Sequence, residues 1–472
     1  MAEISKLEEK LALRKESTWL KVDEAKKEKV FKFAEGYKKF INESKTERQA
    51  VKYILELAKN KGFQALDKIK ALKPGDRVYE INRDKNIILA VIGSEALEKG
   101  LNIIVSHLDA PRIDLKPNPL YEDKDSYLGL FKTHYYGGIK KYHWVNLPLA
   151  LYGKIIKKDG KELDIKIGEN DDEAIFVIPD LLPHLSKKYQ DERKLSEGIK
   201  GEELNVIVGS IPVKDKKVKE KIKLYLLNEL NKKYGLVEED FISAELQFVP
   251  AGKAKDIGFD RSLIGAYGQD DRICAYTALQ AILEQTAPKR TCIALFVEKE
   301  EIGSEGATGM KSMFFEDFVS KLISLTEKYD EYILKRALAN SKAISADVNG
   351  ALDPSFKEVH EIANAAKLGL GVVITKYTGA GGKFLASEAT AEYVGAIRNL
   401  LNQEKISWQS SELGKVDEGG GGTVAKYLAE YNMDVIDMGP PILSMHSPLE
   451  ISSKADIYES YRAYKTFFVS VL

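Results

Sequence analysis

The sequence predicts an α/β fold in which helices flank a mixed sheet and a β-rich domain is inserted into the chain. Apolar segments such as 101–107 and 292–297 alternate with helical patterns towards both ends of the sequence, as in layered α/β folds. The middle of the chain instead carries short strand-like segments that are interrupted by prolines. With 472 residues, the chain is also long enough for more than one core.

The first part of the α/β domain opens with a helical pattern over residues 4–60, in which apolar positions recur every three or four residues. Three strand-like segments follow, and the last of them, 101–107, is nearly all apolar. A strand that is buried on both faces of a sheet has this composition. We assign residues 1–115 to this part.

The inserted β-rich domain spans residues 116–261 in this interpretation. Strand-like segments such as 149–156 and 163–168 follow one another there, and 213–235 has the pattern of a long helix. Residues 262–472 return to alternating strands and helices and form the second part of the α/β domain. Helices are predicted in this part at 271–285, 386–403 and 455–472.

Charge and cysteine content exclude several classes of protein. Lys and Arg number 71 against 72 Asp and Glu, so no net field attracts nucleic acid or an anionic membrane. The two cysteines, Cys274 and Cys292, cannot form a disulfide framework. The sequence has no apolar run long enough to span a bilayer and no signal-peptide core at its start. We therefore expect a cytoplasmic protein without nucleic-acid or membrane partners.

Histidine and carboxylate side chains stand where predicted strands end. His107 and Asp347 each close an apolar segment. The adjacent pair Glu300 and Glu301 follows a third such segment. In an open α/β sheet the strand ends line the ligand crevice. Imidazole and carboxylate groups together suit Zn²⁺ and its first-row neighbours, so these residues predict a metal site.

Other polar residues near these segments carry weaker signals. Asp109 follows His107 by two positions, a spacing that fits a structural role as well as a functional one. Asp270 and Asp271 stand at the mouth of a predicted helix, where helix capping also explains them. His446 follows a β-like stretch and a Pro-Pro turn.

The adjacent residues Glu300 and Glu301 are predicted to have different roles. Adjacent side chains at a strand end point in different directions, so the two carboxylates should not do the same work. One carboxylate can bind a metal ion while its neighbour faces the water that the metal activates and serves as general base.

Five motifs, in this order and spacing, resemble the aspartyl-aminopeptidase family of dinuclear zinc exopeptidases. They are SHLDAPR at 106–112, DDRICAYTALQA at 270–281, EKEEIGS at 298–304, SADV at 345–348 and LSMHS at 443–447. The segments THYYGGIKKYHW and IPDLLPHL are similar to that family's inserted domain. The resemblance covers nearly the whole chain and implies a phosphorylase/hydrolase-like sheet with an inserted dimerisation domain.

Carried over position by position, the resemblance implies a role for each site residue. The implied ligands of two divalent metal ions per subunit are His107, Asp270, Glu301, Asp347 and His446. Asp270 would bridge the two ions, which would be zinc, with cobalt or manganese as alternatives. Glu300 would be the general base, and Asp109 would accept a hydrogen bond from His107 and fix its tautomer.

The resemblance also bears on substrate and assembly. His184 matches a histidine that reaches a neighbouring subunit's active site in the family, and the implied assembly is a dodecamer built from dimers. Lys376 matches a lysine of the substrate pocket, although an ordinary surface lysine is an equal alternative in this lysine-rich chain. Gly350 stands where members selective for acidic residues carry a histidine. We therefore expect no strong preference for Asp or Glu at the substrate's N-terminus.

The function that follows is a metallo-aminopeptidase that hydrolyses the N-terminal residue from peptides. A related metal-dependent amidase or deacylase is the second interpretation, because the same metal centre could hydrolyse other amides. A non-catalytic oligomeric metal-binding scaffold is the third. Such a scaffold would need the ligands but would have no use for Glu300.

Overall fold

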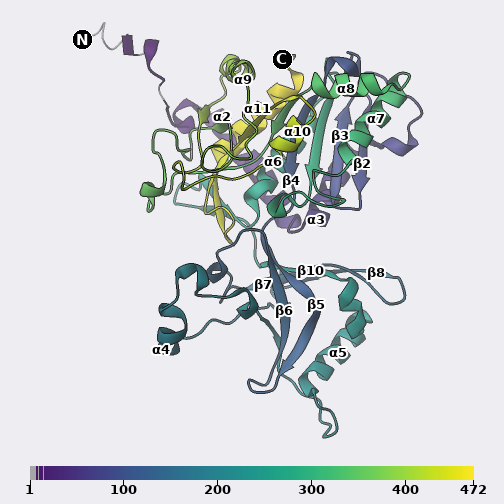
Figure 1. Cartoon of the computed structure of the whole chain (residues 1–472), viewed down its shortest axis with the longest axis vertical. Coiled ribbons are helices and arrows are strands. Elements are labelled where there is room, and N and C mark those ends of the chain that lie inside the picture. Colours follow the sequence, from purple (N-terminus) through teal and green to yellow (C-terminus); the bar gives the residue numbers. More distant parts are fainter. Residues whose placement is uncertain (1–6, 9, 14) are drawn as a thin grey trace. The chain divides into compact units, whose positions relative to one another are not determined.

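A computed structural model describes residues 7–8, 10–13 and 15–472, so part of the helical pattern predicted over 4–60 lies outside the described residues. The chain divides into two compact units (Figure 1). The first unit contains the residues up to Asp109, Ala254–Met445 and Glu450–Leu472, and the second contains Ala110–Lys253 and His446–Leu449. The second unit begins before residue 116 because strand β5, from Arg112, belongs to its sheet.

A nine-stranded mixed sheet forms the centre of the first unit, in the order β1-β2-β3-β13-β4-β14-β18-β16-β17. Its strands are β1 (Gln64–Ala65), β2 (Arg77–Asn82), β3 (Asn86–Val91), β4 (Asn102–His107), β13 (Cys292–Val297), β14 (Lys342–Ser345), β16 (Val372–Thr375), β17 (Trp408–Ser410) and β18 (Asp434–Gly439). The four central strands, β13, β4, β14 and β18, run parallel. Their carboxyl ends therefore lie at one edge of the sheet.

Helices cover both faces of this sheet. Successive residues of a strand point to opposite faces, and here the residues on both faces are apolar and need to be buried. In β3, Ile87 and Leu89 pack into one core, and Ile88 and Ala90 pack into the other. The helices of the first core are α2 (Glu24–Glu43), α3 (Glu47–Asn60), α6 (Gln269–Leu283), α9 (Ala391–Gln403) and α11 (Lys454–Val469). Those of the second core are α7 (Phe314–Thr326), α8 (Glu331–Ala339) and α10 (Ala425–Ala429).

A smaller five-stranded sheet also belongs to the first unit and has the order β11-β12-β20-β19-β15. Its strands are β11 (Lys255–Ile257), β12 (Leu263–Ala266), β15 (Asn349–Gly350), β19 (Pro441–Leu443) and β20 (Glu450–Ser453). The pairing of β12 with β20 brings Glu450 to the start of α6. This sheet therefore supports the helix end that carries Asp270 and Asp271.

The second unit is built on a six-stranded antiparallel sheet in the order β8-β7-β10-β5-β6-β9. Its strands are β5 (Arg112–Asp123), β6 (Leu128–Tyr136), β7 (Leu149–Ile156), β8 (Glu162–Ile167), β9 (Val206–Gly209) and β10 (Glu245–Pro250). Its helices are α4 (Pro183–Ser186) and α5 (Lys221–Tyr234). Helix α5 begins later than the pattern over 213–235 predicts, because the chain turns back there and the Val213 N–H donates to the Lys221 carbonyl. The prediction of a mixed α/β fold is confirmed.

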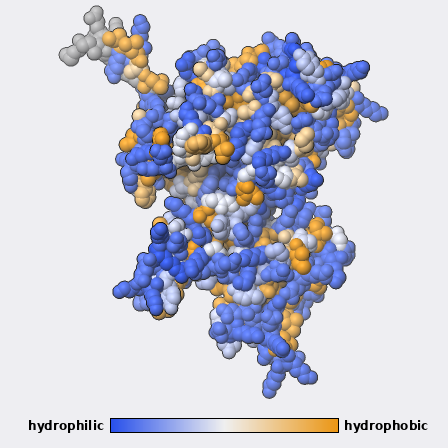
Figure 2. Space-filling view, in the orientation of Figure 1, coloured by the Kyte–Doolittle hydropathy of each residue, from blue (hydrophilic) through white to orange (hydrophobic). Residues whose placement is uncertain are grey.

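The surface visible in Figure 2 is mainly hydrophilic, with separate hydrophobic patches. Both cysteines are buried and free, as expected for thiols within apolar segments. Among the residues that the structure describes, there is no helix with the length and apolar character needed to cross a membrane.

Candidate metal centre

His107 ends β4 at the middle of the nine-stranded sheet and is buried. The neighbouring strands β13 and β14 run parallel to β4, so the segments that follow them start at the same edge. The segment after β13 carries Glu300 and Glu301, and the segment after β14 carries Asp347. Strand order and direction thus bring side chains from three distant parts of the sequence to one place.

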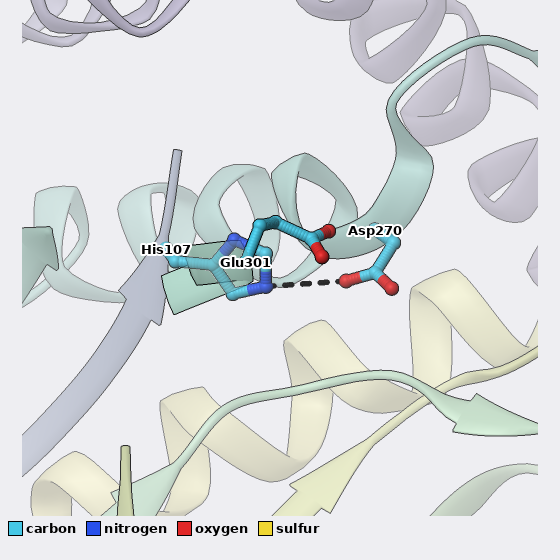
Figure 3. Close-up of side chains that lie close together, drawn as sticks. All are labelled: His107, Asp270 and Glu301. Atoms are coloured by element: carbon cyan, nitrogen blue, oxygen red, sulfur yellow. Dashed lines mark ion pairs between the residues drawn. The ribbon is translucent and has the colours of Figure 1, made fainter. Parts of the chain in front are cut away.

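In the part of the chain that the structure describes, two groups of side chains could hold a metal ion, and His107 belongs to both. The first group adds Asp270 and Glu301, and Figure 3 shows these side chains converging on the imidazole. His107 Nε2 lies 3.1 Å from Asp270 Oδ1. The second group adds Asp271 and Asp347. In each group the possible ligand atoms lie within 4.8 Å of one another.

Asp270 and Asp271 reach the site because the start of α6 is irregular. Both have non-helical dihedral angles, with φ −79° and ψ 110° at Asp270. The Glu450 carboxylate holds this turn by accepting hydrogen bonds from the backbone N–H groups of Gln269, at 2.6 Å, and Asp270, at 3.2 Å. The two aspartates therefore point into the cluster and do not act as simple helix caps.

Asp271 is the site residue that the sequence analysis left without a role. Its Oδ2 accepts a hydrogen bond from the backbone N–H of His107 at 3.3 Å, and its side chain is buried. The available signal was the adjacent acidic pair itself. An acid at the start of a helix is usually a cap, so the pair alone could not reveal a second buried carboxylate beside His107.

Asp109 links His107 to the two glutamates. Its Oδ1 and Oδ2 accept hydrogen bonds from the backbone N–H groups of Glu300 and Glu301, each at 3.2 Å. His107 Nδ1 lies 3.4 Å from Asp109 Oδ1 and 3.1 Å from the Asp109 carbonyl oxygen. A proton on Nδ1 fits these acceptors and leaves the Nε2 lone pair for a cation.

Electrostatics within the cluster favour a bound cation. Burial alone would lower the pKa of His107, but its hydrogen bonds to Asp109 and Asp270 outweigh burial and hold the pKa well above its ordinary value. Burial and the charge of Asp347 raise the pKa of Asp271. Burial and the charge of Asp270 likewise raise the pKa of Asp347. Buried carboxylates that repel one another around an imidazole form a donor set that suits Zn²⁺.

The remaining candidate residues belong to neither of these two groups. His446 is grouped with the second unit, where its Nδ1 lies 2.9 Å from the Gly138 carbonyl oxygen. His184 is exposed on α4 in the same unit. In the first unit, Lys376 lies at the surface, 3.4 Å from Glu388 Oε1, and lines a pocket of about 350 Å³.

Comparison with known proteins yields one family over nearly the whole chain. The model of the family described as "Aminopeptidase I zinc metalloprotease (M18)" matches residues 40–468. A probable M18 family aminopeptidase 1 from Borrelia garinii is 50% identical over 97% of this chain and 100% of its own length. The crystal structure of an M18 family aminopeptidase from Thermotoga maritima is 46% identical, with a TM-score of 0.93 over 97% of this chain and 100% of that chain.

A more distant structure shares the fold. The S. cerevisiae mApe1 dodecamer is 22% identical, with a TM-score of 0.72 over 92% of this chain and 96% of that chain.

The position of Asp109 between His107 and the glutamates can be tested with Asp109→Asn. The amide keeps the size of the side chain but loses the charge that holds the imidazole and one acceptor for the backbone N–H groups. Residues that orient metal ligands typically contribute about 10- to 100-fold to metal affinity, so zinc should bind weaker by about that factor. Chelator competition measures this affinity, and wild-type zinc binding in a folded variant would contradict the role.

Proposed function

This chain belongs to the M18 family of zinc aminopeptidases, and from that premise we propose that its reaction takes place at the His107 cluster. The chain is a hydrolase of the metalloprotease class, and neither the amidase nor the scaffold interpretation is favoured. The observation that supports the location is that His107, Glu301 and Asp347, which end or follow parallel strands, are grouped with Asp270 from the start of α6.

The proposed ligands of two ions come from the two groups that share His107. Asp270 and Glu301 would hold one ion, and Asp347 would hold the other, with Asp271 as an additional candidate beside it. The sequence resemblance alone adds His446 and gives Asp270 the bridging position. When bound, zinc lowers the pKa of water and polarises the carbonyl that is attacked.

Glu300 is the proposed general base. Its backbone N–H, like that of Glu301, donates to the Asp109 carboxylate, so the two adjacent carboxylates extend from one anchored segment. Glu300 is half-buried and contributes to the raised pKa of Asp347, which is governed first by burial and by Asp270. Its carboxylate takes a proton from the attacking water and delivers it to the leaving amine.

Glu300→Gln and Glu301→Gln separate the two roles. Glu300→Gln keeps size and hydrogen bonding but removes the basic oxygen, so kcat should fall by roughly 10²–10⁴ while zinc content and KM stay near wild type. Glu301→Gln should weaken zinc binding, and added zinc should partly restore activity. Metal stoichiometry is measured beside kcat for both variants. The roles are reversed if Glu300→Gln loses zinc, and the assignment of the base fails if it stays active.

In this proposal the enzyme has no strong preference for Asp or Glu at the substrate's N-terminus. A Cβ at Gly350 would lie 2.7 Å from Leu413 Cδ1, so an apolar side chain borders the position at which acidic-selective relatives carry histidine. Lys376 is already paired with Glu388. The negative charge of Glu388 weakens the attraction of Lys376 for a substrate carboxylate. Lys383 lies 3.0 Å from the same Glu388 oxygen, so three charged groups share this surface.

Substrate preference is measured as kcat/KM for leucyl and aspartyl p-nitroanilides. The leucyl substrate should react at least as well, because no histidine stands at position 350 to bind an acidic side chain. Lys376→Ala should leave the ratio of the two values nearly unchanged. A preference for the aspartyl substrate of roughly 100-fold would show that another group recognises the carboxylate.

A homo-oligomer built through the second unit completes the proposal. Large apolar side chains on and around α4 are exposed, including Leu182, Leu185 and Tyr189, and His184 lies among them. Exposed apolar side chains that cluster in this way are typical of protein interfaces. The proposed state is a dodecamer built from dimers, the S. cerevisiae mApe1 structure being a dodecamer as well, and the proposed location is the cytoplasm.

Sedimentation tests the assembly. The wild type should sediment as a species larger than a dimer, and Leu185→Glu should reduce its size because a charge would be buried at the interface. Phe259→Glu, at a fully exposed apolar residue of the first unit, serves as control and should leave the assembly intact. A fully active wild-type monomer would contradict both the assembly and any role of His184 in a neighbouring subunit.

A further inference from the structure

The segment that carries Glu300 and Glu301 is a loop closed at its neck, here called the Glu300 loop (residues 298–308). At the neck, the Glu298 N–H donates to the Thr308 carbonyl at 3.4 Å. The Thr308 hydroxyl donates back to the Glu298 carboxylate. Both side chains are buried, with 1% of Glu298 and 4% of Thr308 exposed. The loop thus leaves β13 and returns through one pair of residues.

The backbone of this loop cannot hold its shape by local preference. Lys299, with φ 71°, and Ser304, with φ 62°, occupy the left-handed region that disfavours side chains. Gly309 accepts no side chain, since a Cβ there would lie 2.0 Å from the Ser304 carbonyl oxygen. Such a conformation persists only where surrounding contacts determine it. The Glu300 loop therefore depends on its anchors.

The anchors come from the hairpin between β2 and β3. Lys85 Nζ lies 2.9 Å from Glu298 Oε1, so each oxygen of the buried carboxylate has a partner. Asn86 Nδ2 donates to the Thr308 carbonyl at 2.7 Å, and Asn82 Nδ2 donates to the Ala307 carbonyl at 2.7 Å. A charged hydrogen bond in a buried place is stronger and more directional than one at the surface.

We propose that Glu298 is a positioning residue for the zinc site: held by Lys85 and Thr308, it fixes the neck of the Glu300 loop and with it the two catalytic glutamates. Asp109 holds the same loop at a second point, because its carboxylate accepts hydrogen bonds from the backbone N–H groups of Glu300 and Glu301. The two anchors act at different points, since Glu298 fixes where the loop begins and ends. The inference rests on the proposed roles of Glu300 and Glu301.

The test is Glu298→Gln, which keeps the size of the side chain but removes the charge that Lys85 binds. Zinc should bind about 10- to 100-fold weaker by chelator competition, and kcat should fall by a similar factor with KM nearly unchanged. Circular dichroism should show an intact fold, and hydrogen exchange of the amides of residues 299–307 should be faster than in the wild type.

Glu47→Gln is the matched control. Glu47 is also buried and lies 3.7 Å from Lys85 Nζ, so this variant removes an equal charge beside the same lysine. Its site is the start of α3, outside the Glu300 loop. Stability should fall by a similar amount in both variants, but zinc affinity and kcat should change only in Glu298→Gln.

A second pair of variants decides the matter if Glu298→Gln does not fold. Thr308→Val removes the hydroxyl that bonds Glu298 and should weaken zinc binding, whereas Thr308→Ser keeps the hydroxyl and should restore it. Wild-type zinc affinity and kcat in folded Glu298→Gln, or in Thr308→Val, would overturn the inference. Normal zinc binding in Glu301→Gln would contradict the proposed role of Glu301 as a ligand. Failure of the proposed function can therefore be distinguished from failure of the inference about Glu298.

Discussion

Carboxylates buried beside His107 repel one another, and the first unit is arranged to hold them together. Burial and mutual repulsion raise the pKa of Asp271 and of Asp347, which is the electrostatic cost of gathering acids in a place of low dielectric. A divalent cation offsets that cost, and a fold that tolerates the cluster must also supply hydrogen bonds to it. This arrangement of charge suits the zinc ion that the family's metalloprotease class requires.

The sheet brings these groups together because its central strands are parallel. Parallel strands end at the same edge, so His107 after β4, Glu301 after β13 and Asp347 after β14 become neighbours. Asp270 arrives by another route, through the irregular start of α6, which Glu450 of the smaller sheet holds. Both sheets of the first unit therefore take part in building one site.

Backbone hydrogen bonds hold the segment that carries Glu300 and Glu301. Asp109 accepts hydrogen bonds from the backbone N–H groups of both Glu300 and Glu301, so one carboxylate anchors the two residues to which the proposal assigns proton transfer and metal binding. At the neck of the same loop, Glu298 is buried between Lys85 and Thr308. Anchors of this kind let a loop with left-handed residues keep one conformation.

From the sequence we could predict the mixed α/β class and the positions at which polar residues end apolar strands, because periodicity and residue type are local properties. Motif resemblance supplied the family. The folded chain was needed to see that Asp271 lies against His107, that Asp109 holds Glu300 across 191 positions of sequence, and that Glu298 faces Lys85. Those contacts depend on strand order and on the irregular turn at Asp270, which arise from pairing between distant segments and leave no periodic signal in the chain.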